Sequence, residues 1–92
     1  MLITYKSPHG EDFTIQWGVG CMVLHKAQND KQHNPVIYAG SHEIEIEIEP
    51  GELLYGIKTA LMHERREQKG YEIIIDSRSD IGSYTMDIVH TE

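Results

Sequence analysis

Residues 43–49 alternate glutamate and isoleucine, and this run constrains the fold more than any other part of the chain. Successive side chains of a β-strand point to opposite faces of its sheet. We therefore predict a strand over residues 42–49 whose isoleucines meet the core and whose glutamates face away from it. The inward residues are Ile44, Ile46 and Ile48, and the outward residues are Glu43, Glu45, Glu47 and Glu49.

The chain has 92 residues, 39% of them apolar and 25% charged, which is enough for one domain with a thin core. We expect a single domain over residues 1–92. No apolar run approaches the roughly 20 residues that span a bilayer. The lone cysteine, Cys21, cannot form an internal disulfide bond, which favours a reducing compartment, with the cytoplasm as the default.

Short alternating segments, separated by glycine and proline, predict further strands on both sides of this run. These strands cover residues 1–6, 12–17, 21–26, 71–76 and 83–90, with a shorter extended piece at 35–39. The segment 21–26 is apolar on both faces, which is typical of a central strand. Residues 28–34 are polar and predict a loop, and residues 77–82 predict a turn.

One helix is predicted from about residue 51 to residue 68. Pro50 and Glu52 suit its N-terminus, and Gly70 suits its end. Its core-facing stripe follows the i, i+3, i+4 spacing and consists of Leu53, Leu54, Ile57, Ala60 and Leu61.

The expected fold class is therefore α+β. We expect two layers, with a mostly antiparallel sheet of about five or six strands and the helix packed on one of its faces. If strands 42–49 and 71–76 share this sheet, they run parallel, and the connection between them is a right-handed crossover.

The same alternation extends the acidic face to the strands after the helix. Tyr71, Ile73 and Ile75 are predicted to point inward, as are Tyr84, Met86 and Ile88. If all three strands lie in one sheet, its open face collects seven carboxylates: Glu43, Glu45, Glu47, Glu49, Glu72, Asp76 and Asp87. Like charges opposite each other lower stability, so the counter-ions would have to come from elsewhere.

The net charge of −7 is segregated, because residues 41–56 carry five glutamates and no lysine or arginine. Side chains on one face of a strand repeat every ~6.6–6.8 Å, on the scale of the phosphate spacing in nucleic acids. We infer a face that imitates a row of phosphates and binds a basic protein in a salt-sensitive way, with no direct binding of nucleic acid. Two alternatives stay open: a solvated face whose charge discourages aggregation, and a cation site.

A second candidate interface lies on the helix. Tyr55, Thr59, Met62 and Arg66 share the side opposite the predicted core stripe. Tyrosine, methionine and arginine are typical of protein interfaces. This side could contact a partner or a second copy of the chain.

Metal and catalytic motifs are absent from the sequence. Cys21 and His25 would lie ~13 Å apart along one strand, too far to share an ion. His33 and His42 flank a loop, but no HxH, HExxH or CxxC spacing occurs. The acids and hydroxyls of residues 76–80 are typical of a turn, and the turn at 18–20 lacks the third glycine of a phosphate-binding loop. We expect no metal, no cofactor and no catalysis.

Small size, acidity, a lone cysteine and the lack of a catalytic motif make the chain similar in kind to phage-encoded inhibitors of host defence and to immunity proteins that neutralise toxic nucleases. This likeness of composition implies a non-catalytic inhibitor that occupies a basic, nucleic-acid-binding surface of its partner through the seven carboxylates. One alternative is an assembly module that self-associates through Tyr55 and Met62. A third hypothesis is a small metal-dependent hydrolase that uses the same carboxylates.

Overall fold

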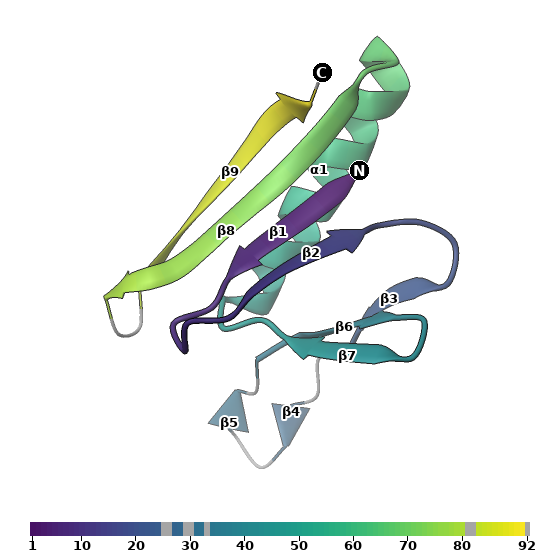
Figure 1. Ribbon diagram of the computed structural model, residues 1–92. Coiled ribbons are helices and arrows are strands. Elements are labelled where there is room, and N and C mark those ends of the chain that lie inside the picture. The colour runs from purple at the N-terminus through teal and green to yellow at the C-terminus, as the bar shows by residue number, and fades with distance from the viewer. Residues whose placement is uncertain (25–26, 29–30, 33, 81–82, 92) are drawn as a thin grey trace.

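A computed structural model describes residues 1–24, 27–28, 31–32, 34–80 and 83–91, which form a four-stranded sheet, a three-stranded sheet, a two-stranded sheet and a helix (Figure 1). The larger sheet, sheet A, has the strand order β2-β1-β8-β9. Its strands are β1 (Leu2–Lys6), β2 (Asp12–Gln16), β8 (Gly70–Asp80) and β9 (Ser83–Thr91). β1 and β8 pair in parallel, and the other two pairs are antiparallel.

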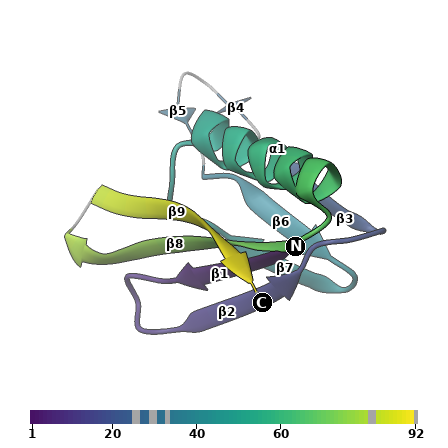
Figure 2. The ribbon, with the colours of Figure 1, turned by 90° about the horizontal axis from the view of Figure 1, so that it is seen from above.

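The smaller sheet, sheet B, is antiparallel and has the order β3-β6-β7. Its strands are β3 (Cys21–Leu24), β6 (Val36–Ala39) and β7 (His42–Glu45). Two further strands of two residues each, β4 (Ala27–Gln28) and β5 (Lys31–Gln32), pair with each other. The helix α1 (Pro50–Glu67) lies across one face of sheet A, and sheet B stands beside the helix, on the side away from β9 (Figures 1 and 2).

The predicted α+β class, with one helix on a mostly antiparallel framework, is confirmed. The prediction that residues 42–49 share a sheet with 71–76 is wrong, because β7 belongs to sheet B and β8 to sheet A. The parallel neighbour of β8 is β1. The cause is local: a turn at Gly40 and Ser41, with Gly40 at φ +64°, folds β7 directly back onto β6.

Three predicted boundaries also differ. The strand predicted over 42–49 ends at Glu45. The turn predicted at 77–82 is wrong at its start, because β8 continues to Asp80 past a register shift that follows Asp76, while residues 81–82 lie outside the described part. The loop predicted at 28–34 contains β5 and the end of β4.

The helix begins and ends within one residue of its predicted bounds. Glu49 caps it, since its carboxylate accepts a hydrogen bond of 2.9 Å from the backbone N–H of Glu52. Gln68, in the left-handed conformation at φ 54°, ends it and donates its backbone N–H to the carbonyl of Glu64. Arg65 and Arg66 lie in the last turn, where positive charge complements the helix dipole.

The helix stripe that faces the core was only partly predicted. Leu53, Ile57 and Ala60 are buried as expected, but Leu54 and Leu61 are exposed. The residue that takes their place is Gly56, where an added Cβ would lie 2.9 Å from Sδ of Met86. The missing side chain therefore lets α1 approach β9 closely.

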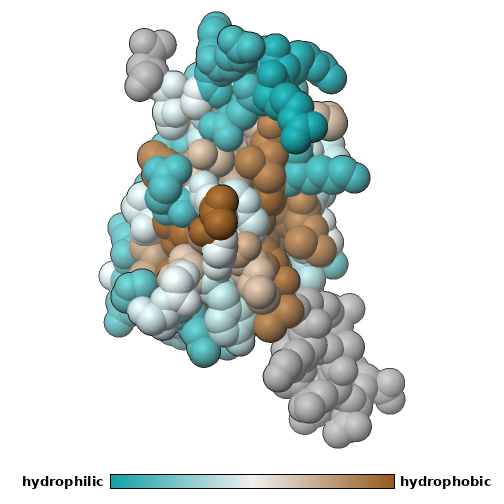
Figure 3. Space-filling model, turned by 90° about the vertical axis from the view of Figure 1, so that its right-hand side faces the viewer, coloured by the Kyte–Doolittle hydropathy of each residue, from teal (hydrophilic) through white to brown (hydrophobic). Residues whose placement is uncertain are grey.

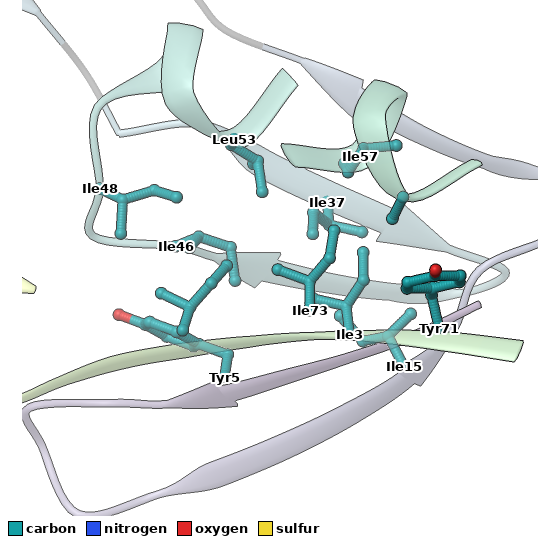
Figure 4. Close-up of a cluster of buried hydrophobic side chains, with 12 residues drawn as sticks. Ile3, Tyr5, Ile15, Ile37, Ile46, Ile48, Leu53, Ile57, Tyr71 and Ile73 are labelled. Atoms are coloured by element: carbon teal, nitrogen blue, oxygen red, sulfur yellow. The ribbon is translucent and has the colours of Figure 1, made fainter. Parts of the chain in front are cut away.

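The core lies between α1, sheet A and sheet B (Figure 4). Its buried apolar members are Ile3, Tyr5, Ile15, Ile37, Ile46, Ile48, Leu53, Ile57, Ala60, Tyr71, Ile73 and Ile75. Figure 4 shows Ile37 of β6 among helix residues Leu53 and Ile57 and sheet A residues Ile3 and Ile73. Sheet B is therefore part of the same core.

The segment 46–49 carries the chain from sheet B to the helix. Ile46 and Ile48 are buried, which confirms their predicted inward direction although no strand continues there. Two backbone N–H groups anchor the segment: the N–H of Ile46 donates to the backbone carbonyl of Pro35 at 2.9 Å, and the N–H of Glu47 donates to the side-chain hydroxyl of Tyr5 at 3.0 Å. The alternation of buried and more exposed side chains therefore continues beyond Glu45, where strand pairing ends.

Candidate functional site

The seven predicted carboxylates do not form one face. Glu43 and Glu45 belong to sheet B, Glu47 and Glu49 to the connecting segment, and the remaining three, Glu72, Asp76 and Asp87, to sheet A. The single seven-carboxylate surface is therefore wrong in its geometry. Whether these residues bind a partner stays a prediction.

The three carboxylates of sheet A do share its open face, as predicted, but cations and polar groups accompany them. Asp76 pairs in register with Lys6 of β1, and its carboxylate lies 3.1 Å from the guanidinium of Arg78. The hydrogen bonds from Arg78 hold the pKa of Asp76 below its usual range. Glu72 accepts a hydrogen bond from the hydroxyl of Thr4. This face therefore supplies part of its own charge compensation.

Glu47 and Glu49 have structural roles in the segment before the helix. The carboxylate of Glu47 lies 3.2 Å from Nε2 of His9, and its backbone carbonyl accepts a hydrogen bond from the Ser77 hydroxyl at 3.4 Å. Glu49 caps the helix. The other two glutamates of the run, Glu43 and Glu45, lie on the strand β7.

Glu43 and Glu45 share the outer face of sheet B with apolar side chains. In an antiparallel sheet, residues directly opposite each other lie on the same face. The register therefore defines two rows across this face, Met22–Tyr38–Glu43 and Leu24–Val36–Glu45. Alternate residues of the same strands, among them Val23, Ile37 and Ile44, pack toward the core.

This outer face is open and graded from apolar to acidic. Met22 and Leu24 of the edge strand β3 are 52% and 42% exposed, and Glu43 and Glu45 of β7 are exposed at the opposite edge. Glu45 accepts a hydrogen bond of 3.0 Å from the amide of Asn34. Within the described residues, no ion pair involves either glutamate. We call these two rows the outer face of sheet B.

The contribution of β3 was missed, because an apolar strand was interpreted as a central one. It is an edge strand with one covered and one open face. Exposed apolar side chains also occur at Val19 in the preceding turn and at Leu54 and Leu61 of the helix. Figure 3, which views the right-hand side of Figure 1, shows apolar side chains gathered across the middle of that side between hydrophilic ones. Because residues 21–24 are all apolar, their sequence does not distinguish the exposed Met22 and Leu24 from the covered Cys21 and Val23.

The second predicted interface is exposed as expected. Tyr55 and Met62 are 67% and 51% exposed, Arg66 is exposed, and Thr59 is half-buried. This flank of α1 lies toward β9, because Glu52 on the same flank accepts a hydrogen bond from the hydroxyl of Tyr84.

A group of aromatic, imidazole and carboxylate side chains at the C-terminal end of α1 was not predicted. The Tyr71 hydroxyl donates to the carboxylate of Glu67 and lies 3.1 Å from Nε2 of His90. The Tyr71 ring stacks on His63 at 5.4 Å and contacts the His90 ring at 4.4 Å. The hydrogen bond to Glu67 raises the pKa of Tyr71 to about 12 and lowers that of Glu67. These contacts tie the helix end to β8 and β9.

Possible metal ligands and nucleophiles are scattered over the described ranges. No group of three or more histidine, cysteine, aspartate or glutamate side chains is arranged there to hold a metal ion. Cys21 is half-buried on the core side of β3, with Sγ 3.7 Å from the carbonyl of Gln16. His25 and His33, considered as metal ligands above, lie outside the described residues. The metal-dependent hydrolase hypothesis gains no support from this arrangement.

Comparisons with protein-family models, with curated proteins and with solved structures find no match to this chain. No helix in the described part is long and apolar enough to cross a membrane. The functional interpretation therefore depends on the surfaces described above.

Proposed function

We propose that this chain is a non-catalytic protein-binding module that holds a basic, partly apolar segment of a partner protein on the outer face of sheet B. The observation that carries the proposal is the register of β3, β6 and β7, which places two carboxylates and the exposed Met22 and Leu24 on one surface. Apolar contacts at the centre of an interface supply affinity, and charges at its rim supply rate and specificity.

The charge of the whole molecule supports the same kind of partner. A net charge of −7 attracts basic proteins and repels nucleic acids. The specific form of the proposal is an inhibitor that occupies a nucleic-acid-binding surface in a reducing, cytoplasmic compartment. Two glutamates on a strand, spaced ~6.6–6.8 Å apart, imitate only a short stretch of phosphates. We therefore assign more of the affinity to the apolar side chains of this face, Met22, Leu24, Val36 and Tyr38, than to its two glutamates.

A pull-down from lysate with two matched double variants tests this proposal. Glu43→Lys with Glu45→Lys reverses the charges on the outer face of sheet B. Asp12→Lys with Asp87→Lys changes the net charge equally on the open face of sheet A, where both aspartates are exposed. We expect a partner that elutes as salt rises, is kept by the sheet A variant and is lost by the sheet B variant.

Equal loss of the partner in both variants would show that binding follows net charge alone, and it would reject the proposed face. Retention in both variants would reject it as well. Circular dichroism of each variant establishes that both remain folded before the comparison is made.

A further inference from the structure

The strand β9 forms a long outer edge of sheet A. It runs for nine residues, Ser83–Thr91, with β8 on one side and no strand on the other among the described residues. Natural edge strands are usually shortened or blunted by lysine, proline or a bulge. The sequence of β9 contains neither lysine nor proline, and its pairing with β8 is regular from Thr85 to Thr91. Such an edge offers a row of backbone N–H and C=O groups to another strand.

The side chains under this edge are incompletely covered. Tyr84, Met86 and Ile88 point to the helix side but are only half-buried, whereas Ile73 and Ile75 of the neighbouring β8 are fully buried. The helix lies over β8 and reaches β9 with its edge, through Gly56 against Met86. A further apolar surface beyond β9 would complete the cover.

The flank of α1 above this edge is complementary to a reversed copy of itself. Along the helix, the flank reads Glu52, Tyr55, Thr59, Met62 and Arg66, with the acid at one end and the base at the other. A two-fold axis at Thr59 brings Glu52 of one copy opposite Arg66 of the other, twice. Such self-complementarity is what a symmetric dimer interface requires.

We propose that a second copy of this chain binds here, by antiparallel pairing of the two β9 strands and apposition of the two α1 flanks. The pairing extends sheet A to a continuous sheet across the two-fold axis. With strands ~4.8 Å apart, two helices above the β8 strands lie ~14 Å from each other. Direct helix packing needs only 8–10 Å, so long side chains must fill the gap. The exposed Tyr55 and Met62 are placed to do so.

The strand register agrees with this axis. Gly56 lies against Met86, and Thr59 stands about 4.5 Å further along the helix. At about 3.4 Å per strand residue, Thr59 lies above Asp87 or Ile88. A pairing centred on Asp87 would oppose two carboxylates, whereas one centred on Ile88 opposes Asp87 to Val89. We therefore place the axis at Ile88.

Sedimentation equilibrium of the full chain, from micromolar to millimolar concentration, tests the dimer through three variants. Arg66→Glu places acids opposite acids and should weaken dimerisation about tenfold or more, because two contacts turn repulsive. The double variant Glu52→Arg with Arg66→Glu restores opposite charges and should recover most of the affinity. Arg65→Glu makes the same change one residue away, on a different side of the helix, and should leave the dimer intact.

A wild-type chain that stays monomeric at all concentrations would overturn the proposal. So would equal weakening by Arg65→Glu and Arg66→Glu, or a failure of Arg66→Glu to weaken the dimer. Because Glu52 also bonds Tyr84, a second measurement keeps the test independent of the double variant. In a mixture of isotope-labelled and unlabelled chains, isotope-filtered NMR should show contacts between β9 strands of different molecules, and contacts from another surface in their place would refute the assignment.

Discussion

At the residue scale, the glutamate–isoleucine run predicts burial well and function poorly. Its isoleucines pack inward as expected, with Ile46 and Ile48 buried. Its glutamates have three different roles, since Glu47 contacts His9, Glu49 caps the helix, and the other two stand on a sheet. The alternation predicts which side of the chain is exposed to solvent. The contacts of each exposed side chain depend on residues far away in the sequence, and a local pattern carries no information about those residues.

The contact between Glu67 and Tyr71 gives a prediction for pH dependence. The Tyr71 hydroxyl lowers the pKa of Glu67, so folding gains stability above the ordinary glutamate value of 4.5 and loses it as the pH falls through the lowered value. We expect Tyr71→Phe to raise the pKa of Glu67 toward that ordinary value. A carboxyl NMR titration measures it, and an unchanged pKa would show that the hydroxyl is not the cause.

The same variant has a second signature at alkaline pH. The pKa of Tyr71 is raised from 10.0 to about 12, so its contribution is complete below pH 10 and lost as the pH rises toward 12. The stability difference between wild type and Tyr71→Phe should therefore shrink over that range. Denaturant unfolding at several pH values measures the difference.

At the scale of elements, the helix and most strands could be predicted because their signals are local. Proline and an acid mark the start of α1, and alternation marks the strands. The helix face was less well predicted. Leu54 and Leu61 are apolar and suit a core stripe but are exposed, whereas Gly56, which has no side chain to suggest burial, is buried. The close approach of Met86 selects the glycine, and that contact depends on tertiary packing.

The turn between β6 and β7 decides which sheet contains Glu43 and Glu45, and it gives a stability prediction. Gly40 has φ +64°, and an added Cβ there would meet no atom within 4 Å, so only backbone strain opposes a substitution. Gly40→Ala should lower the free energy of unfolding by about 1–2 kcal/mol. Gly40→Asn should cost less, because asparagine tolerates this conformation. Denaturant unfolding compares them, and equal costs would mean that strain at φ does not control this turn.

At the scale of the whole molecule, the fold class followed from the order of elements, but the division into two sheets did not. Strand pairing depends on tertiary contacts between strand edges. On the sequence pattern alone, either β1 or β7 is compatible with a parallel position beside β8. The pairing with β1 moves Glu72, Asp76 and Asp87 away from Glu43 and Glu45. It also separates the two proposed surfaces, since β9 and sheet B lie on opposite sides of the molecule (Figure 1).

The proposed function requires that Glu43 and Glu45 share a face with Met22 and Leu24 and not with Glu72 and Asp87. Cross-strand proton contacts, measured by NMR on the isotope-labelled chain, test it most directly. We expect antiparallel contacts of Tyr38 with both Met22 and Glu43, and parallel contacts of β1 with β8. Parallel contacts between residues 42–45 and 71–76 would contradict it and would restore the single acidic face.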